Sequence, residues 1–282
     1  MNKTNRPEIW AFTPSIKTRS PGLRVSGHGL TDVGQRREAN EDSFLVLPRN
    51  HLWVVADGMG GHAGGQVASR LTVQEVARSV IRRLAAAERA TGVGPINVPG
   101  VVEAAVLDAC ALVFDTARHY PELAGMGSTC TMMLLYGAVF YFGHVGDSRA
   151  YLIRDGEINQ ITEDHSLVQE QVAAGLITAE QARHSMMRNI ITRSIGFERE
   201  VKVDVGAVPA LPGDIFLLCS DGLTGEIHDE ELLQFVERYG PQKAGRALIN
   251  EANRRGGDDN STVVLTQVHS KRRLRGRARF AV

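Results

Sequence analysis

Apolar residues follow two different periods along the chain, and each period predicts a different kind of element. Short apolar runs bounded by turn residues predict strands, and the run at 52–56 is apolar throughout, as in a strand buried on both faces. Spacings of three and four residues predict one helix from Val73 to Leu84 and another from Val102 to Ala117. The expected strands occupy 23–31, 43–47, 52–56, 128–135, 139–145, 149–154, a segment ending at 161, 201–208, 214–219 and 261–268.

The order of these elements indicates the fold class. A loop rich in Gly and Pro at 91–100 separates the first two helices, and a second helix pair is expected at 229–238 and 242–254. Strands therefore come in runs and helices come in pairs, which is the α+β pattern rather than strict alternation of strand and helix. We expect two packed antiparallel β-sheets flanked by helix pairs, an αββα sandwich.

Charge separates the two ends of the chain from its middle. The chain has 282 residues and a formal net charge of zero, yet residues 25–270 hold 31 acidic and 21 basic residues. An acidic body argues against nucleic acid as a partner and favours a cation site. We expect an irregular arm at 1–22, one domain at 23–268 and a basic tail at 269–282, in which six of the last twelve residues are Lys or Arg.

Cysteine and hydropathy patterns bear on location. The three cysteines form no CxxC pair, so a zinc site or a thioredoxin-like site is excluded, and free cysteines fit a reducing compartment. The longest apolar stretch, 130–145, is interrupted by Tyr136-Gly137 and predicts two strands rather than a membrane span. We expect a cytoplasmic monomer without a membrane span.

Acidic residues stand at the ends of several predicted strands. A carboxylate at a strand end is held by the sheet, and an adjacent glycine lets a ligand approach the backbone closely. Any one of these positions is explained by an ordinary turn, whereas several on one rim would repel each other without a cation. Oxygen ligands favour Mg²⁺ or Mn²⁺. The acidic turns are Glu41-Asp42, Asp57-Gly58, Gly146-Asp147, Asp221-Gly222 and Asp258-Asp259.

The glycine-rich segment from Gly58 to Ala63 also matches the dinucleotide pattern G-x-G-x-x-A after a strand. Asp57 would lie beside the pyrophosphate and repel it, and no acidic residue ends a second strand about 20 positions later. No P-loop, no G-x-S-x-G elbow and no Cys followed five residues later by a phosphate-binding Arg is present.

Seven motifs occur in one order along the chain, covering about residues 25–268. Together they resemble the metal-dependent protein phosphatase family, the protein phosphatase 2C-like serine/threonine phosphatases, in its bacterial form. The motifs are Thr31-Asp32-Val33-Gly34, Asn40-Glu41-Asp42-Ser43, Asp57-Gly58-Met59-Gly60-Gly61-His62-Ala63-Gly64-Gly65, Gly127-Ser128-Thr129, Gly146-Asp147-Ser148-Arg149, Ser220-Asp221-Gly222-Leu223 and Asp258-Asp259-Asn260-Ser261-Thr262.

The resemblance implies the same sandwich fold and a centre of two Mn²⁺ or Mg²⁺ ions, with a third ion as an additional expectation. A water activated by both ions would attack phosphorus directly, without a phosphoenzyme. The roles implied are these: Asp57 bridges both ions, Gly58 offers its carbonyl, Asp221 and Asp259 complete the ligands, Glu41 and Asp42 hold bound waters, Asp147 binds the third ion, and Arg37 binds phosphate.

Two departures from the family pattern affect this expectation. Gly225 stands four positions after Asp221, where the family often has an acidic residue that serves the third site. Met59 stands where animal members carry a histidine, which leaves His62 as the nearest substitute for a general acid.

We therefore expect a protein serine/threonine phosphatase whose substrates are phosphoproteins made by a cognate serine/threonine kinase. Residues at about 164–195 would form a flap that shapes substrate choice. Two alternatives remain at this point, a catalytically inactive scaffold with the same fold and a regulatory phosphatase of an anti-sigma-antagonist switch.

Overall fold

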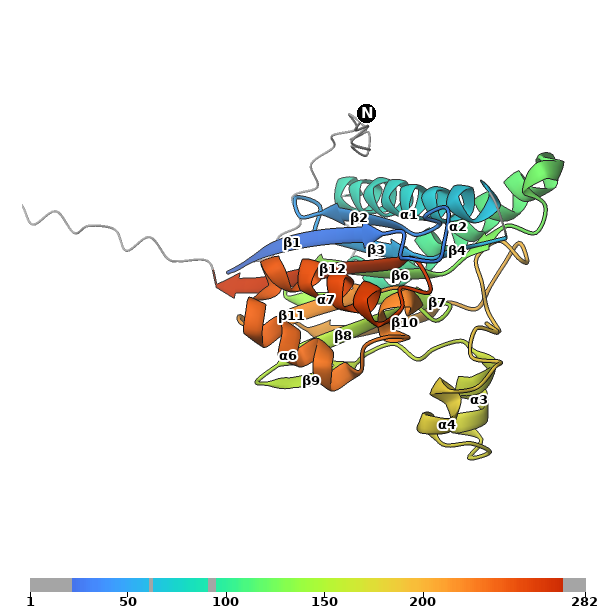
Figure 1. Ribbon diagram of the computed structural model, residues 1–282. Helices are drawn as coiled ribbons and strands as arrows, with labels where there is room; N and C mark the ends of the chain where they lie inside the picture. Colours follow the sequence, from blue (N-terminus) through green and yellow to red (C-terminus); the bar gives the residue numbers. More distant parts are fainter. Residues whose placement is uncertain (1–21, 61–62, 91–94, 271–282) are drawn as a thin grey trace, which may run out of the picture.

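Two five-stranded antiparallel sheets face each other in the computed structural model, which describes residues 22–60, 63–90 and 95–270 (Figure 1). The first sheet has the order β1-β12-β11-β8-β9 and the second the order β10-β7-β6-β3-β2. The strands are β1 Leu23–Asp32, β2 Ser43–Leu47, β3 Leu52–Ala56, β6 Cys130–Tyr136, β7 Val139–Val145, β8 Arg149–Arg154, β9 Glu157–Gln160, β10 Asp204–Pro209, β11 Ile215–Cys219 and β12 Ser261–Ser270. A separate pair joins β4 Gly58–Met59 to β5 Gly127–Ser128.

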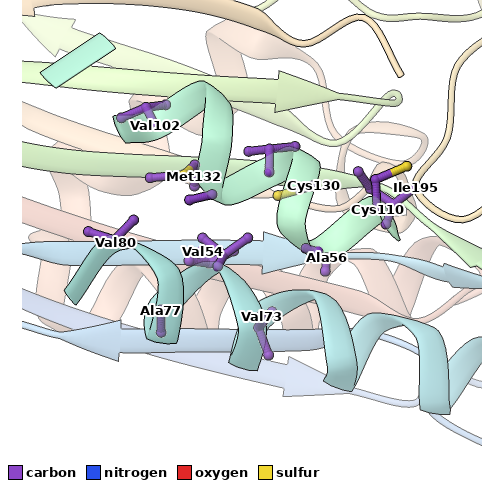
Figure 2. Close-up of a cluster of buried hydrophobic side chains, with 14 of the residues drawn as sticks. Val54, Ala56, Val73, Ala77, Val80, Val102, Cys110, Cys130, Met132 and Ile195 are labelled. Carbon is purple, nitrogen blue, oxygen red and sulfur yellow. The ribbon is translucent and has the colours of Figure 1, made fainter. Parts of the chain in front are cut away.

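A helix pair covers the outer face of each sheet (Figure 1). Helices α1 Ala63–Arg89 and α2 Val98–His119 pack on the second sheet through a core that includes Val54, Val80 and Val102 (Figure 2). Helices α6 Asp229–Tyr239 and α7 Pro241–Arg255 pack on the first sheet through a second core. The expected αββα sandwich is confirmed.

Aromatic side chains fill the space between the two sheets. Phe140 on β7 lies 4.2 Å from Phe216 on β11 between ring centroids, and Trp53 on β3 lies 5.7 Å from Phe140. All three are fully buried. Packing in this layer fixes how the two sheets lie against each other, and therefore where their strand ends meet.

Most of the expected elements are confirmed, and the differences have physical causes. Helix α2 begins at Val98, inside the expected loop, because Asn97 caps it by accepting the Gly100 N–H at 3.1 Å. Pro99, which suggested a loop, is tolerated in a first helical turn. Strand β10 begins at Asp204 rather than at 201, because its pairing with β7 ends at His144, just before β7 itself ends.

Smaller elements complete the chain. A short helix α5, Asp221–Thr224, follows β11 and was not predicted. Helices α3 Leu167–Ala173 and α4 Ala179–Arg183 extend away from the sandwich in Figure 1, and a 3₁₀ turn occupies Pro121–Leu123. In the described parts of the chain, every pairing between named strands is antiparallel, so the parallel βαβ unit of the dinucleotide interpretation is absent. None of the described helices combines the length and the apolar character that crossing a membrane requires.

Candidate metal centre

The acidic strand ends of both sheets converge at one end of the sandwich. Asp57 follows β3 and Asp147 follows β7 in the second sheet, while Asp221 follows β11 and Asp259 precedes β12 in the first. The charge of Asp57 interacts with Asp221, with Asp147 and with Asp42, which precedes β2. Residues more than 160 positions apart in the chain therefore share one electrostatic environment, an arrangement that the resemblance to the family implied.

Burial is the largest cause of the raised pKa values of the aspartates in this cluster. Loss of water raises the pKa of Asp57 well above its usual range, and the charges of Asp42, Asp221 and Asp147 raise it further. The pKa of Asp147 is raised by burial and then by Asp221, and that of Asp221 is raised by burial and then by Asp259. Keeping all of these groups ionised at neutral pH requires a positive charge among them.

Burial also raises the pKa of Asp42, although two hydrogen bonds act in the opposite direction. Its Oδ2 accepts the hydroxyls of Thr262 at 2.6 Å and Ser220 at 2.7 Å, and both bonds favour the carboxylate. Burial outweighs them and, with the charges of Asp221 and Asp259, raises the pKa of Asp42 to about 7. Ser220 and Thr262 belong to two of the seven motifs, but nothing in the sequence indicates that their hydroxyls bind Asp42.

Two buried carboxylate oxygens in this cluster have no hydrogen-bond partner in the structure, Asp42 Oδ1 and Asp221 Oδ1. Buried polar atoms are nearly always paired, so unpaired oxygens beside other carboxylates are suitable positions for a cation or its waters. The donor set is all oxygen, which fits Mg²⁺ or Mn²⁺ better than zinc or copper.

No three His, Cys, Asp or Glu side chains form a ready-made ligand shell around one point among the described residues. Mg²⁺ usually keeps several waters and takes one or two carboxylates from the protein. Asp259 Oδ2 instead accepts the guanidinium Nη2 of Arg37 at 2.7 Å.

Hydrogen bonds to Thr129 hold the backbone of Asp57 in place. The Asp57 N–H donates to Thr129 Oγ1 at 2.8 Å, and the Asp57 carbonyl accepts the Thr129 N–H at 2.8 Å. The Thr129 hydroxyl also contacts the Ser148 hydroxyl at 2.7 Å. Asp57 is thus tied to the segment that carries Asp147, because Ser148 is the next residue.

Gly58 must be glycine for steric reasons. A Cβ at this position would collide with the backbone carbonyl of Gly65 and approach the carbonyl oxygen of Glu41 to 2.6 Å. The Gly58 N–H donates to that Glu41 carbonyl at 3.2 Å. The close approach joins the Asp57 turn to the Glu41-Asp42 segment and to the beginning of α1.

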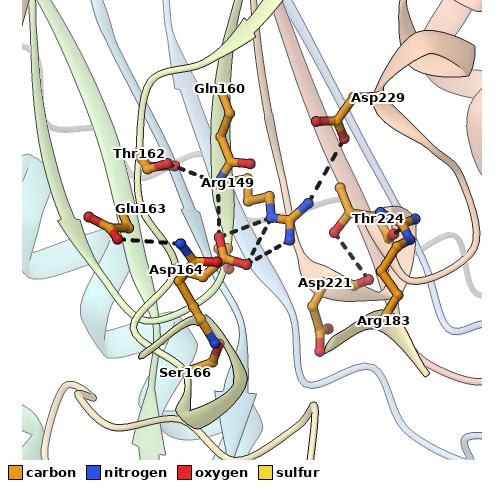
Figure 3. A network of polar contacts seen from close by, with 12 residues as sticks. Arg149, Gln160, Thr162, Glu163, Asp164, Ser166, Arg183, Asp221, Thr224 and Asp229 are labelled. Atoms are coloured by element: carbon orange, nitrogen blue, oxygen red, sulfur yellow. Dashed lines mark hydrogen bonds and ion pairs between the residues drawn. The ribbon is translucent and has the colours of Figure 1, made fainter. Parts of the chain in front are cut away.

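The segment at 164–195 is connected to the cluster through polar contacts (Figure 3). Arg149 binds Asp164 with both ends of its guanidinium, at 2.9 Å from Nε and 2.7 Å from Nη2. Arg183 in α4 donates to the carbonyl of Thr224 at 3.1 Å, and Thr224 lies in α5, which begins with Asp221. The segment is therefore hydrogen-bonded to residues that closely follow Asp147 and Asp221 in the chain.

Three residues remain from the sequence-based expectations for the site, namely His62, Met59 and Gly225. His62 lies outside the described residues, so its expected role is neither supported nor opposed. Met59 lies in β4 opposite Gly127, and Gly225 donates its N–H to the Asp221 carbonyl at 2.6 Å at the end of α5. Neither residue adds a carboxylate to the site.

Comparisons with known proteins agree with this geometry. The profile of the family described as Protein phosphatase 2C matches residues 34–252. The serine/threonine protein phosphatase PstP of Mycobacterium tuberculosis is 39% identical over 243 residues, which are 84% of this chain and 44% of PstP. Protein phosphatase PhpP of Streptococcus pneumoniae is 35% identical over 260 residues, covering 86% of this chain and 97% of PhpP. The chain thus spans less than half the length of PstP and nearly all of PhpP.

Solved structures give the same relationship. The catalytic domain of PstP in complex with two manganese ions matches with a TM-score of 0.76 and 35% identity, covering 88% of this chain and all of that domain. A serine/threonine phosphatase from S. agalactiae matches with a TM-score of 0.75 and 32% identity, covering 88% of this chain and 100% of that structure. On the evidence of its fold, its acidic cluster and these matches, the chain belongs to the protein phosphatase 2C family.

Proposed function

We propose that the chain is a metal-dependent protein serine/threonine phosphatase that hydrolyses phosphoserine and phosphothreonine in proteins. The observation that carries the proposal is the buried cluster of Asp42, Asp57, Asp147 and Asp221, in which Asp42 Oδ1 and Asp221 Oδ1 have no hydrogen-bond partner and in which burial raises the pKa of every carboxyl group. Relatives named as serine/threonine phosphatases, and the two manganese ions bound by the PstP domain, support the same conclusion.

We propose that Asp57, the Gly58 carbonyl, Asp221 and Asp259 would hold the two ions, as the resemblance to the family implies. Asp42 and Glu41 would hold bound waters, and Asp147 would bind a third ion. When bound, two Mn²⁺ or Mg²⁺ ions lower the pKa of a water and offset the charge of the phosphate.

Arg37 would orient the phosphate. Its side chain is 52% exposed and reaches Asp259, so it lies at the open edge of the cluster. A guanidinium can bind two phosphate oxygens at once, which stabilises negative charge as the bond to the leaving oxygen breaks. Protonation of that leaving oxygen stays a prediction for His62 or a water.

We propose further that the substrates are phosphoproteins of a partner serine/threonine kinase and that the protein acts as a monomer in the cytoplasm. Cys110, Cys130 and Cys219 are all free and buried, which fits a reducing compartment. We also propose that 23–268 is the catalytic domain, that 164–195 is a flap for substrate choice, and that an arm at 1–22 and a basic tail lie outside it. The tail was expected from 269, but strand β12 continues to Ser270 because His269 and Ser270 pair with Arg24 and Leu23.

The test is hydrolysis of p-nitrophenyl phosphate with and without Mn²⁺, followed by peptides carrying phosphoserine, phosphothreonine or phosphotyrosine. The expected result is activity that depends on Mn²⁺ or Mg²⁺, with the first two peptides preferred. A folded protein that binds Mn²⁺ without hydrolysing any of these compounds would identify an inactive scaffold instead.

A further inference from the structure

The segment that carries Arg37 has no regular structure of its own. Residues 33–42 connect β1 in the first sheet to β2 in the second, so the segment crosses the end of the sandwich. Arg37 lies within this crossing and is more than half exposed. A residue that must orient a phosphate needs a fixed position, because a displaced guanidinium can no longer donate to two phosphate oxygens at once.

One buried amide closes this segment at its base. Asn260 is only 5% exposed, and its Nδ2 donates to two carbonyls, Val33 at 2.9 Å and Ala39 at 3.0 Å. Its Oδ1 accepts the N–H of Glu41 at 2.7 Å. The two carbonyls lie on either side of Arg37 in the sequence, so a single NH₂ group joins both ends of the loop that presents the guanidinium.

The orientation of this amide is fixed by its partners. A carbonyl can only accept and a backbone N–H can only donate. Exchanging Oδ1 and Nδ2 would therefore place the amide oxygen against two carbonyl oxygens and the NH₂ group against the Glu41 N–H. All three bonds go to the backbone of the 33–41 segment. The side chain of Asn260 therefore supports this segment alone, whatever side chains the segment carries.

The backbone of Asn260 contacts the segments that carry Asp259 and Asp221. The Asn260 N–H donates to Asp259 Oδ1 at 2.8 Å, which orients that carboxylate. The carbonyl of Asn260 lies against Gly222 so closely that a Cβ at 222 would collide with it. Asn260 thus fixes the position of the Arg37 loop relative to Asp259 and Asp221.

We propose that Asn260 is a positioning residue that acts through Arg37. It holds the guanidinium at a fixed distance from the acidic cluster, where the guanidinium can bind phosphate. This inference rests on the proposed phosphatase activity. Asn260 itself touches neither the phosphate nor the ions in this role. Its side chain closes the loop, its N–H orients Asp259, and phosphate affinity follows from the distance thus fixed between Arg37 and the cluster.

Two variants separate the contacts. Asn260→Asp keeps the acceptor for Glu41 but replaces the donor with an oxygen that faces the carbonyls of Val33 and Ala39. Asn260→Leu has nearly the same size, carries no charge and removes all three bonds. Asn253→Leu is the matched control, because Asn253 Nδ2 donates to Asp32 Oδ1 at 2.9 Å beside the same segment but not across the Arg37 loop.

The measurements are KM and kcat for p-nitrophenyl phosphate with saturating Mn²⁺, and the Kd of inorganic phosphate by calorimetry. Both Asn260 variants should raise KM and the phosphate Kd about tenfold while kcat changes less than about threefold, consistent with the loss of hydrogen bonds that hold a charged group. The Asn253 variant should leave KM and Kd unchanged. Adding either Asn260 substitution to Arg37→Ala should change KM no further, because the group being positioned is already gone.

Several results would overturn the inference. An unchanged phosphate Kd in a variant that unfolds cooperatively would do so, as would effects of Arg37→Ala and Asn260→Leu that multiply in the double variant. If the leucine variant does not fold, the aspartate variant alone decides, since it keeps the Glu41 contact. An inactive wild-type protein would instead refute the proposed function, so the two failures are distinguishable.

Discussion

The guanidinium of Arg37 donates to the carboxylate of Asp259 at 2.7 Å, although the two residues are 222 positions apart in the chain. Half of the Arg37 side chain remains exposed, so the contact leaves the guanidinium at the edge of the acidic cluster rather than inside it. An exposed ion pair of this kind contributes little to stability, which makes a binding role the better reason for the geometry.

Arg37→Ala should therefore weaken phosphate binding more than it slows turnover. A hydrogen bond to a charged group contributes about 1.5–3 kcal/mol, so KM for p-nitrophenyl phosphate should rise about tenfold to a hundredfold. Arg37→Lys should recover only part of the loss, because an ammonium cannot bind two oxygens in one plane. Steady-state kinetics with saturating Mn²⁺ measures both variants. Unchanged KM and kcat in Arg37→Ala would rule out the assigned role.

Asp57→Asn and Asp221→Asn should each abolish metal-dependent turnover, with a loss of more than about a hundredfold, since even outer partners of metal ligands cost up to that much. Each change removes a negative charge from the cluster at constant size. Asp155→Asn is the matched control, because Asp155 lies at the β8–β9 hairpin with a φ of 54°, which asparagine tolerates. A titration of activity against Mn²⁺ checks all three, and full activity in either site variant would contradict the assignment.

His144 should make stability fall in mild acid. It is fully buried, its Nε2 lies 3.0 Å from the Glu163 carbonyl, and burial lowers its pKa to about 4 from an ordinary 6.5. The unfolded chain takes up the proton between those values and the folded chain does not. This contribution is therefore complete above pH 6.5 and is lost as the pH falls toward 4.

The expected loss is about 3 kcal/mol, because one pKa unit corresponds to about 1.36 kcal/mol. Urea unfolding of the chelator-treated protein from pH 7 to pH 4 measures it. His144→Gln keeps a neutral donor for the Glu163 carbonyl and should flatten that part of the pH dependence. A variant with the same slope as the wild type would show that other groups cause it.

Arg183→Ala should change substrate preference and leave small-substrate turnover intact. The residue anchors α4 to the Thr224 carbonyl at 3.1 Å, and it is a long way in sequence from any expected ligand. Its removal should alter relative kcat/KM values among phosphopeptides about threefold to tenfold, with p-nitrophenyl phosphate unaffected. Arg188→Ala, an exposed position in the same segment, serves as the control. Exchanging 164–195 for the corresponding segment of PhpP should have the same selective effect.

The sequence predicts the sandwich well because its strands are continuous apolar runs and its helices have regular apolar spacing. The run at 52–56 coincides with β3, and the end of that run places Asp57 correctly. Convergence of the acidic residues did not follow from any one motif, because it depends on how two sheets pack. The order of motifs supplied it only through resemblance to a family.

The sequence could not indicate the hydrogen bonds that residues far away in the chain make to the site. Asn260 reaches carbonyls that are 227 and 221 positions away, and backbone carbonyls leave no trace in the identity of Val33 or Ala39. The hydroxyls of Ser220 and Thr262 on Asp42 are equally non-local. The beginning of α2 was missed for a local reason, since Asn97 and Pro99 are compatible with either a loop or a helix cap.

The ring layer between the sheets has a consequence for ion selection. Trp53, Phe140 and Phe216 lie on the strands that precede Asp57, Asp147 and Asp221, so the packing of these rings contributes to the spacing between carboxylates from opposite sheets. Trimming one ring would let one sheet slide relative to the other. We therefore expect that replacing one of these rings by a smaller side chain would change the spacing of the carboxylates, and with it the relative affinity for manganese and magnesium.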